Sequence, residues 1–259
     1  MAILNPMQPQ PFTIGDITRA LMTGGQAFRA MPGPSVGYAM LFALIGLVLM
    51  TVVGVFGVSP LVLPLAGGFM LVGPALLAGF FALDRIQASG GRPSTTDALA
   101  GFTSAPPGLW AIGGICAFLF LIWITDVGVL YAFMIGAEHL PYELPWLFRL
   151  RQDVVAFEFW ASVMGSLLAF AIFSISAFSV PLLYERRAGP IEAVSISVRE
   201  VFSNLIPALL WGMLLSLATI LAILLLPLLL VVLPVLAYAN FALYRTVFPV
   251  DPAERIAKM

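Results

Sequence analysis

The sequence predicts an all-α fold, a polytopic membrane bundle of about six transmembrane helices, and three observations predict it. Hydrophobic residues make up 61% of the 259 residues and charged residues only 10%, whereas soluble domains carry about 25% charged residues. The mean hydropathy is +1.04. Several apolar runs reach roughly 20 residues, the length that crosses the hydrocarbon core of a bilayer as a helix.

The spans are read from apolar runs that end at charges, proline or glycine. The first four are expected at 35–57, 60–83, 108–135 and 155–184. A further apolar stretch covers 207–244, which is too long for one ordinary span and just long enough for two. A tight turn near 225–227 would separate two spans, and a single long tilted helix with an interfacial end is the alternative. Two spans here give six in total.

The basic residues predict the orientation of these spans. A cytoplasmic N-terminus places ten basic residues on the cytoplasmic side, where short loops of membrane proteins are rich in Lys and Arg, and leaves only Arg149 and Arg151 outside. The ten are Arg19, Arg29, Arg85, Arg92, Arg186, Arg187, Arg199, Arg245, Arg255 and Lys258. We therefore expect a bacterial inner (cytoplasmic) membrane protein with both termini in the cytoplasm.

Three segments begin with the same kind of helix start, a capping residue followed three positions later by an acid. An acid in the first turn is stabilised by unpaired backbone N–H groups and by the helix dipole. The pairs are Thr13 with Asp16, Ser94 with Asp97, and Gly189 with Glu192. Each predicts an amphipathic helix at the cytoplasmic interface. The third shows an apolar stripe of Val194, Val198, Val201, Phe202 and Leu205.

These segments predict three copies of one unit, an amphipathic helix followed by a transmembrane hairpin, at about 13–85, 94–187 and 190–245. Each copy ends in a related string: Leu83-Asp84-Arg85, Leu183-Tyr184-Glu185-Arg186 and Leu243-Tyr244-Arg245. The single membrane domain then covers 13–247, between a flexible tail at 1–12 and a cytoplasmic tail at 248–259. The alternative is convergence, because any interfacial helix needs a cap, an apolar stripe and a basic border.

This layout, with strings such as Phe81-Ala82-Leu83-Asp84-Arg85, resembles an uncharacterised family of bacterial integral membrane proteins. Members of that family are often labelled as cytochrome c oxidase subunits. The resemblance covers roughly residues 13 to 247. It implies a helical membrane fold and an association with respiratory membranes, and it supplies no functional residues.

The residues argue against catalysis and against a bound cofactor. The chain has one histidine, His139, and one cysteine, Cys116, whereas bis-His haem and dinuclear copper sites need more ligands than these. Hydrolase, zinc-protease and nucleotide-binding motifs are absent. The net charge of −1 gives no sign of nucleic-acid binding. We expect no enzyme activity, no cofactor and no metal.

Two acids and three pairs of small residues are the candidate site residues. Asp126 and Glu158 lie toward the outer ends of the third and fourth spans, either as interfacial acids paired with Arg149 or Arg151 or as a cation or proton site. Small residues four apart let helices approach closely, either within the bundle or at a seam for a partner protein. These pairs are Ala75 with Gly79, Gly113 with Ala117, and Gly165 with Ala169.

Two classes of function remain. The favoured class is a non-catalytic accessory, assembly or scaffolding partner of a larger membrane complex, with a respiratory complex indicated by the resemblance. Its partners would be the lipid bilayer and other membrane protein subunits. The alternative is a small-solute or cation transporter or channel that uses the outer acids, although no charged residue lies near the middle of any span.

Overall fold

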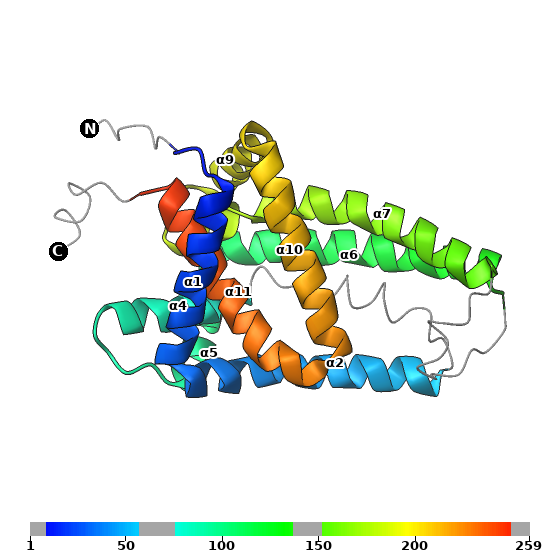
Figure 1. The fold of residues 1–259 in the computed structure, drawn as a ribbon, viewed down its shortest axis with the longest axis horizontal. Coiled ribbons are helices and arrows are strands. Elements are labelled where there is room, and N and C mark those ends of the chain that lie inside the picture. The colour runs from blue at the N-terminus through cyan, green and yellow to red at the C-terminus, as the bar shows by residue number, and fades with distance from the viewer. Residues whose placement is uncertain (1–8, 57–75, 137–151, 250–259) are drawn as a thin grey trace.

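The computed structural model describes residues 9–56, 76–136 and 152–249, and the regular elements in these ranges are all α-helices (Figure 1). Five helices of this part are long and apolar enough to cross a membrane. They are α2 (Pro32–Val55), α6 (Pro107–Met134), α7 (Gln152–Ser176) continued by α8 (Ser179–Tyr184), α10 (Leu205–Leu224) and α11 (Leu226–Val247). The predicted all-α, polytopic helical bundle is therefore confirmed.

The predicted second span, 60–83, falls mostly on 57–75, outside the described residues. Its last turns are the start of α4 (Leu77–Ala88). The apolar stretch 207–244 forms two helices, because α10 ends at Leu224 and α11 begins at Leu226. The single long helix is therefore wrong. Pro227 lies in the first turn of α11, where its missing N–H leaves no intrahelical hydrogen bond unmade.

The fourth span is interrupted about three-quarters of the way along, between Ser176 and Ser179. Ser197, from the neighbouring short helix, compensates for the interruption. Its hydroxyl accepts a hydrogen bond from the Phe178 N–H (3.1 Å) and donates one to the Ser174 carbonyl (2.8 Å). The backbone groups exposed by the interruption are thus satisfied inside the bundle, as buried polar groups must be.

The three predicted interfacial helices are α1 (Ile14–Ala30), α5 (Thr95–Thr103) and α9 (Pro190–Ser203), and each begins after its predicted cap. The Asp16 carboxylate accepts hydrogen bonds from the Thr13 hydroxyl (2.6 Å) and N–H (2.7 Å), which lower the pKa of Asp16. The Asp97 carboxylate likewise accepts hydrogen bonds from the Ser94 hydroxyl and N–H, which lower the pKa of Asp97. Gly189 has no side chain, so only its N–H reaches Glu192, at 3.5 Å.

The face that α9 presents to the bundle differs from the predicted stripe. Ala193, Ser197 and Val201 are buried, whereas Phe202 is 57% exposed. The stripe is therefore buried in part: Val201 faces the bundle, and the exposed Phe202 ring contacts Phe170 of α7 edge-on at 5.7 Å. The physical reason is close packing: small side chains let the short helix lie against α8, which leaves larger apolar groups at the surface, where lipid can cover them.

The packing of the short helices links the three hairpins in a ring, in which the first short helix contacts the last hairpin. Helix α5 packs on α4, α9 packs on α7 and α8, and α1 packs on α11. Each short helix thus lies against the helix that ends the preceding hairpin, and the first lies against the last. Figure 1 shows α1 crossing α11, while α6 and α7 extend together away from these two helices. The cyclic order supports the predicted repeat, which remains a proposal.

Candidate functional site

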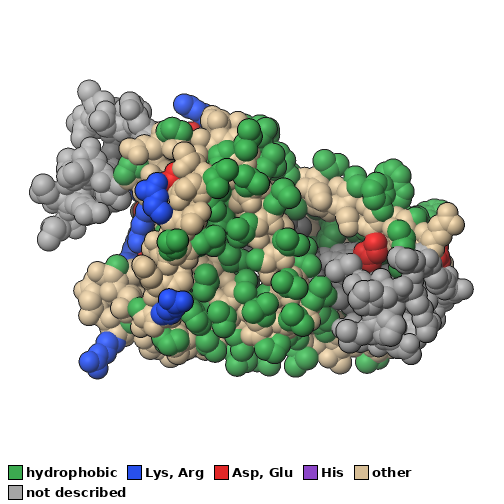
Figure 2. Space-filling model, in the orientation of Figure 1, with side chains coloured by type: hydrophobic (Ala, Val, Ile, Leu, Met, Phe, Trp, Pro, Cys, Tyr) green, Lys and Arg blue, Asp and Glu red, His purple; other side chains and the backbone are tan. Residues whose placement is uncertain are grey.

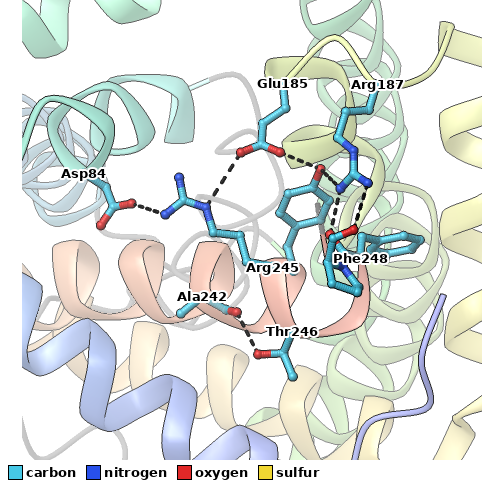
Figure 3. A network of polar contacts seen from close by, with 9 residues as sticks. Asp84, Glu185, Arg187, Ala242, Arg245, Thr246 and Phe248 are labelled. Carbon is cyan, nitrogen blue, oxygen red and sulfur yellow. Dashed lines mark hydrogen bonds and ion pairs between the residues drawn. The ribbon is translucent and has the colours of Figure 1, made fainter. Parts of the chain in front are cut away.

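The three strings that end the predicted repeats meet at one place, although they are far apart in the sequence (Figure 3). The Arg245 guanidinium at the end of α11 donates to Asp84 of α4 at 2.8 Å and lies 3.7 Å from Glu185, which follows α8. The Tyr244 hydroxyl donates to Glu185 at 2.9 Å. One cation therefore links the ends of two other hairpins.

An aromatic layer lies beside this ionic cluster, with one ring from each hairpin end, taken from the string itself or from the two residues before it. Phe81 stacks on Phe241 with ring centroids 4.3 Å apart, and Tyr184 meets both rings edge-on at 5.4 and 6.1 Å. The guanidinium of Arg245 lies 4.0 Å from the Phe241 ring centroid, and that of Arg85 lies 5.1 Å from the Tyr184 centroid. Such cation–π contacts stabilise a guanidinium in addition to any ion pair that it makes.

The electrostatics of the cluster fit a clamp between helices. Burial raises the pKa of the Asp84 carboxyl, and the neighbouring Arg245 opposes this change. Arg187 donates to the Tyr244 hydroxyl (3.2 Å) and to the Phe248 carbonyl (2.7 Å), so it also holds the end of α11. The main groups of this cluster are thus engaged with one another, and the arrangement joins the three hairpins at one end.

The same end of the molecule carries every described arginine. They come from α1, α4, α9 and α11 and from the segments that follow α4 and α8: Arg19, Arg29, Arg85, Arg92, Arg186, Arg187, Arg199 and Arg245. Figure 2 shows basic side chains at this end and an acidic side chain at the opposite end.

A second polar place lies inside the bundle, in a cavity of about 990 Å³ between α2, α4, α6, α7, α10 and α11. Glu158 and Trp123 line it, and the Glu158 Oε1 and Trp123 Nε1 atoms are buried without a hydrogen-bond partner in the described part of the chain. On the cavity wall, Trp211 donates to the Asn240 side-chain oxygen at 3.2 Å. Among these residues the sequence had indicated only Glu158 as a functional candidate.

The two candidate acids are not brought together. Asp126 is exposed on α6, whereas the side of α6 that carries Trp123, Val127 and Tyr131 is buried against α7. Asp126 makes no hydrogen bond or ion pair with another described residue. Its expected partners, Arg149 and Arg151, lie outside the described residues. Asp126 therefore lies on the outside of the hairpin, and Glu158 faces the cavity.

The small-residue pairs lie at helix contacts in two of three cases. A Cβ on Gly79 would collide with the Tyr38 ring of α2, and one on Gly165 would come within 3.2 Å of Trp123 of α6. Ala169 lines the cavity. Gly113 and Ala117 are half-buried on α6, and Ala75 lies outside the described residues.

Few side chains in the described ranges could hold a metal ion or a cofactor. The described ranges contain no group of three or more His, Cys, Asp and Glu residues able to hold a metal ion. Cys116 is buried in α6, and His139 lies outside these ranges. Trp123 and Tyr244 gave no functional signal in the sequence beyond the similarity of 241–245 to 81–85, because their roles depend on contacts between hairpins.

Comparison with known proteins gives one match. Residues 62–185, a little under half of the chain, match the model of a family described as "Predicted integral membrane protein (DUF2189)". This confirms, for these residues, the resemblance to an integral membrane protein family of unknown function. No curated protein and no solved structure matches the chain.

Proposed function

We propose that this integral membrane protein is a non-catalytic accessory, assembly or scaffolding partner of a larger membrane complex, and that it binds its partner along the outer side of α6. The observation that supports the proposal is the position of Asp126. Its carboxylate lies on the outside of the α6–α7 hairpin, exposed in the described structure. Acidic residues within transmembrane segments are rare and are usually paired with another residue.

The surroundings of Asp126 suit a protein partner. Ile115, Ile122, Val129 and Phe133 lie on the same side of α6, at helical spacing from Asp126, and are 48%, 42%, 51% and 86% exposed. An apolar stripe with one carboxylate matches a helix that carries a basic or hydrogen-bond-donating residue at the same depth. Asp126 is nineteen residues from Pro107, roughly 28 Å along the helix, and this distance supports a position near the outer membrane surface.

The test is a photo-crosslinking residue at position 122, compared with one at Leu217, which is 72% exposed on α10. We expect a discrete protein adduct from position 122 in native membranes, lost in Asp126→Arg, and none from position 217. The respiratory complexes indicated by the sequence resemblance are the first candidates for the adduct. If Arg149 or Arg151 satisfies Asp126 within the chain, no adduct forms.

We further propose that the arginine-rich end faces the cytoplasm of a bacterial cell and that both termini lie there. The described arginines support this, because all of them gather around α1 and α9 and the ends of α4, α8 and α11. A reporter active only in the periplasm should be silent when fused after residue 259 and active within 137–151. Activity at the C-terminus would contradict the proposed topology.

A second candidate function, transport of a cation, is favoured by one observation: Glu158 lines an internal cavity. It predicts normal assembly and lost cation flux in vesicles that contain Glu158→Gln. The accessory function predicts that the same variant retains its partner.

A further inference from the structure

The cavity inside the bundle has the size and the walls of a small-molecule site. Its volume of about 990 Å³ is at the upper end of the roughly 300–1,000 Å³ that such sites occupy. Its walls are mostly apolar and come from both helices of the second and third hairpins and from α2 and α4 of the first. A molecule bound there would contact all three hairpins.

Two buried polar atoms on this wall lack partners in the described part of the chain. Trp123 is only 5% exposed, yet among the described residues its indole Nε1 finds no acceptor and Glu158 Oε1 finds no donor. Buried polar groups are nearly always paired, and leaving one unpaired costs about 1–3 kcal/mol. Ser162 and Ser166 follow Glu158 at one and two helical turns and also line the cavity.

The charge of the wall selects the ligand. Glu158 is the one charged residue among the described residues that line the cavity, so an anion would meet an unfavourable carboxylate and a cation a favourable one. Five aromatic rings also line it: Phe42, Phe80, Trp123, Phe170 and Phe173. The faces of aromatic rings attract cations, and their edges add apolar surface for the body of the ligand.

We infer that the cavity binds a lipophilic organic cation, with its apolar body against the helices and its positive group near Glu158. This site lies apart from the partner surface on α6, and its occupancy does not depend on the proposed accessory function. The ligand would carry a positively charged group on an apolar body, and its binding requires no partner helix.

Binding of tetraphenylphosphonium to the purified full-length protein in detergent tests the inference. Tetraphenylborate, which has the same shape and the opposite charge, is the ligand control. We expect tetraphenylphosphonium to bind with 1:1 stoichiometry and at least tenfold more tightly than tetraphenylborate. Glu158→Gln should weaken the cation at least tenfold, because it keeps the size of the side chain and removes its charge. Asp126→Asn, which removes an acid outside the cavity, should bind as the unmodified protein does.

A second variant tests the location of the site. Ala169→Phe fills the cavity without changing charge and should lose binding of the cation while its elution volume and helicity stay unchanged. If that variant fails to fold, Glu158→Gln still tests whether the carboxylate in the cavity binds the cation. Equal affinity for the two ions, equal loss in Glu158→Gln and Asp126→Asn, or no saturable binding would overturn the inference. A disulfide test adds one more outcome that would overturn the inference. If the variant Ser166→Cys, Gly68→Cys, Cys116→Ser forms a disulfide efficiently, residues 57–75 occupy the cavity.

Discussion

Replacing Gly24 by alanine is expected to separate α1 from α11 and to destabilise the protein strongly. A Cβ at position 24 would lie 2.5 Å from the Val235 carbonyl oxygen and 2.8 Å from the Ala239 nitrogen. These are backbone atoms of α11, which cannot rotate away as a flexible side chain can. Overpacking of this kind costs about 1–3 kcal/mol, and occasionally more. We expect a lower midpoint of thermal unfolding and faster tryptic cleavage after Arg19 and Arg29, which α1 carries.

Gly25→Ala is the matched control for this prediction. It is the next residue of the same helix, and a Cβ there would meet nothing within 4 Å. Alanine favours a helix over glycine by about 1 kcal/mol, so Gly25→Ala should leave stability unchanged or raise it slightly. Equal behaviour of the two variants would show that α1 does not approach α11 closely.

Arg245→Met is expected to loosen the end where the three hairpins meet. The substitution leaves the carboxylates of Asp84 and Glu185, whose side chains are only 20% and 14% exposed, without their shared cation. Breaking a buried ion pair from one side costs about 3–5 kcal/mol, and an exposed pair contributes about 0–1 kcal/mol. Because Arg245 is 39% exposed, we expect a loss of about 2 kcal/mol, measured as a lower midpoint of thermal unfolding in detergent.

The pH dependence of this loss has a definite sign. Burial already raises the pKa of Asp84, and Arg245 opposes that change. Without Arg245 the pKa rises further, so the folded variant binds protons more readily than its unfolded chain does. The deficit should therefore be largest at neutral pH and should shrink as the pH falls.

Two controls separate this effect from a general loss of positive charge. Arg199→Met removes an exposed arginine of α9 and should have little effect. Asp84→Asn with Glu185→Gln, added to Arg245→Met, removes the stranded charges and should recover part of the stability. A triple variant less stable than Arg245→Met, or an equal loss in Arg199→Met, would contradict the clamp.

The membrane class, the starts of the short helices and most helix limits could be predicted from the sequence. The reason is that apolar length and capping are local properties: 108–135 was expected and α6 covers Pro107–Met134. The ends of the repeats were also visible as strings, yet their meeting at Arg245 depends on how three distant segments pack. Nothing local in the sequence encodes which arginine takes the central place.

Side-chain direction was harder to predict than the helices themselves. The apolar stripe of α9 did not include Ala193 and Ser197, which are the residues that the helix buries against the bundle. In a membrane both faces of a helix can be apolar, so hydrophobicity does not tell the bundle side from the lipid side. For the same reason the sequence did not distinguish Asp126, outside the hairpin, from Glu158, on the cavity wall.

The most direct test of the proposed accessory function is the photo-crosslink from position 122 of α6, measured in native membranes and with the purified protein alone. The account predicts one protein adduct of defined mass in native membranes, absent from the purified protein and abolished by Asp126→Arg while Glu158→Gln retains it. Lipid adducts alone in both preparations, unchanged by Asp126→Arg, would contradict it.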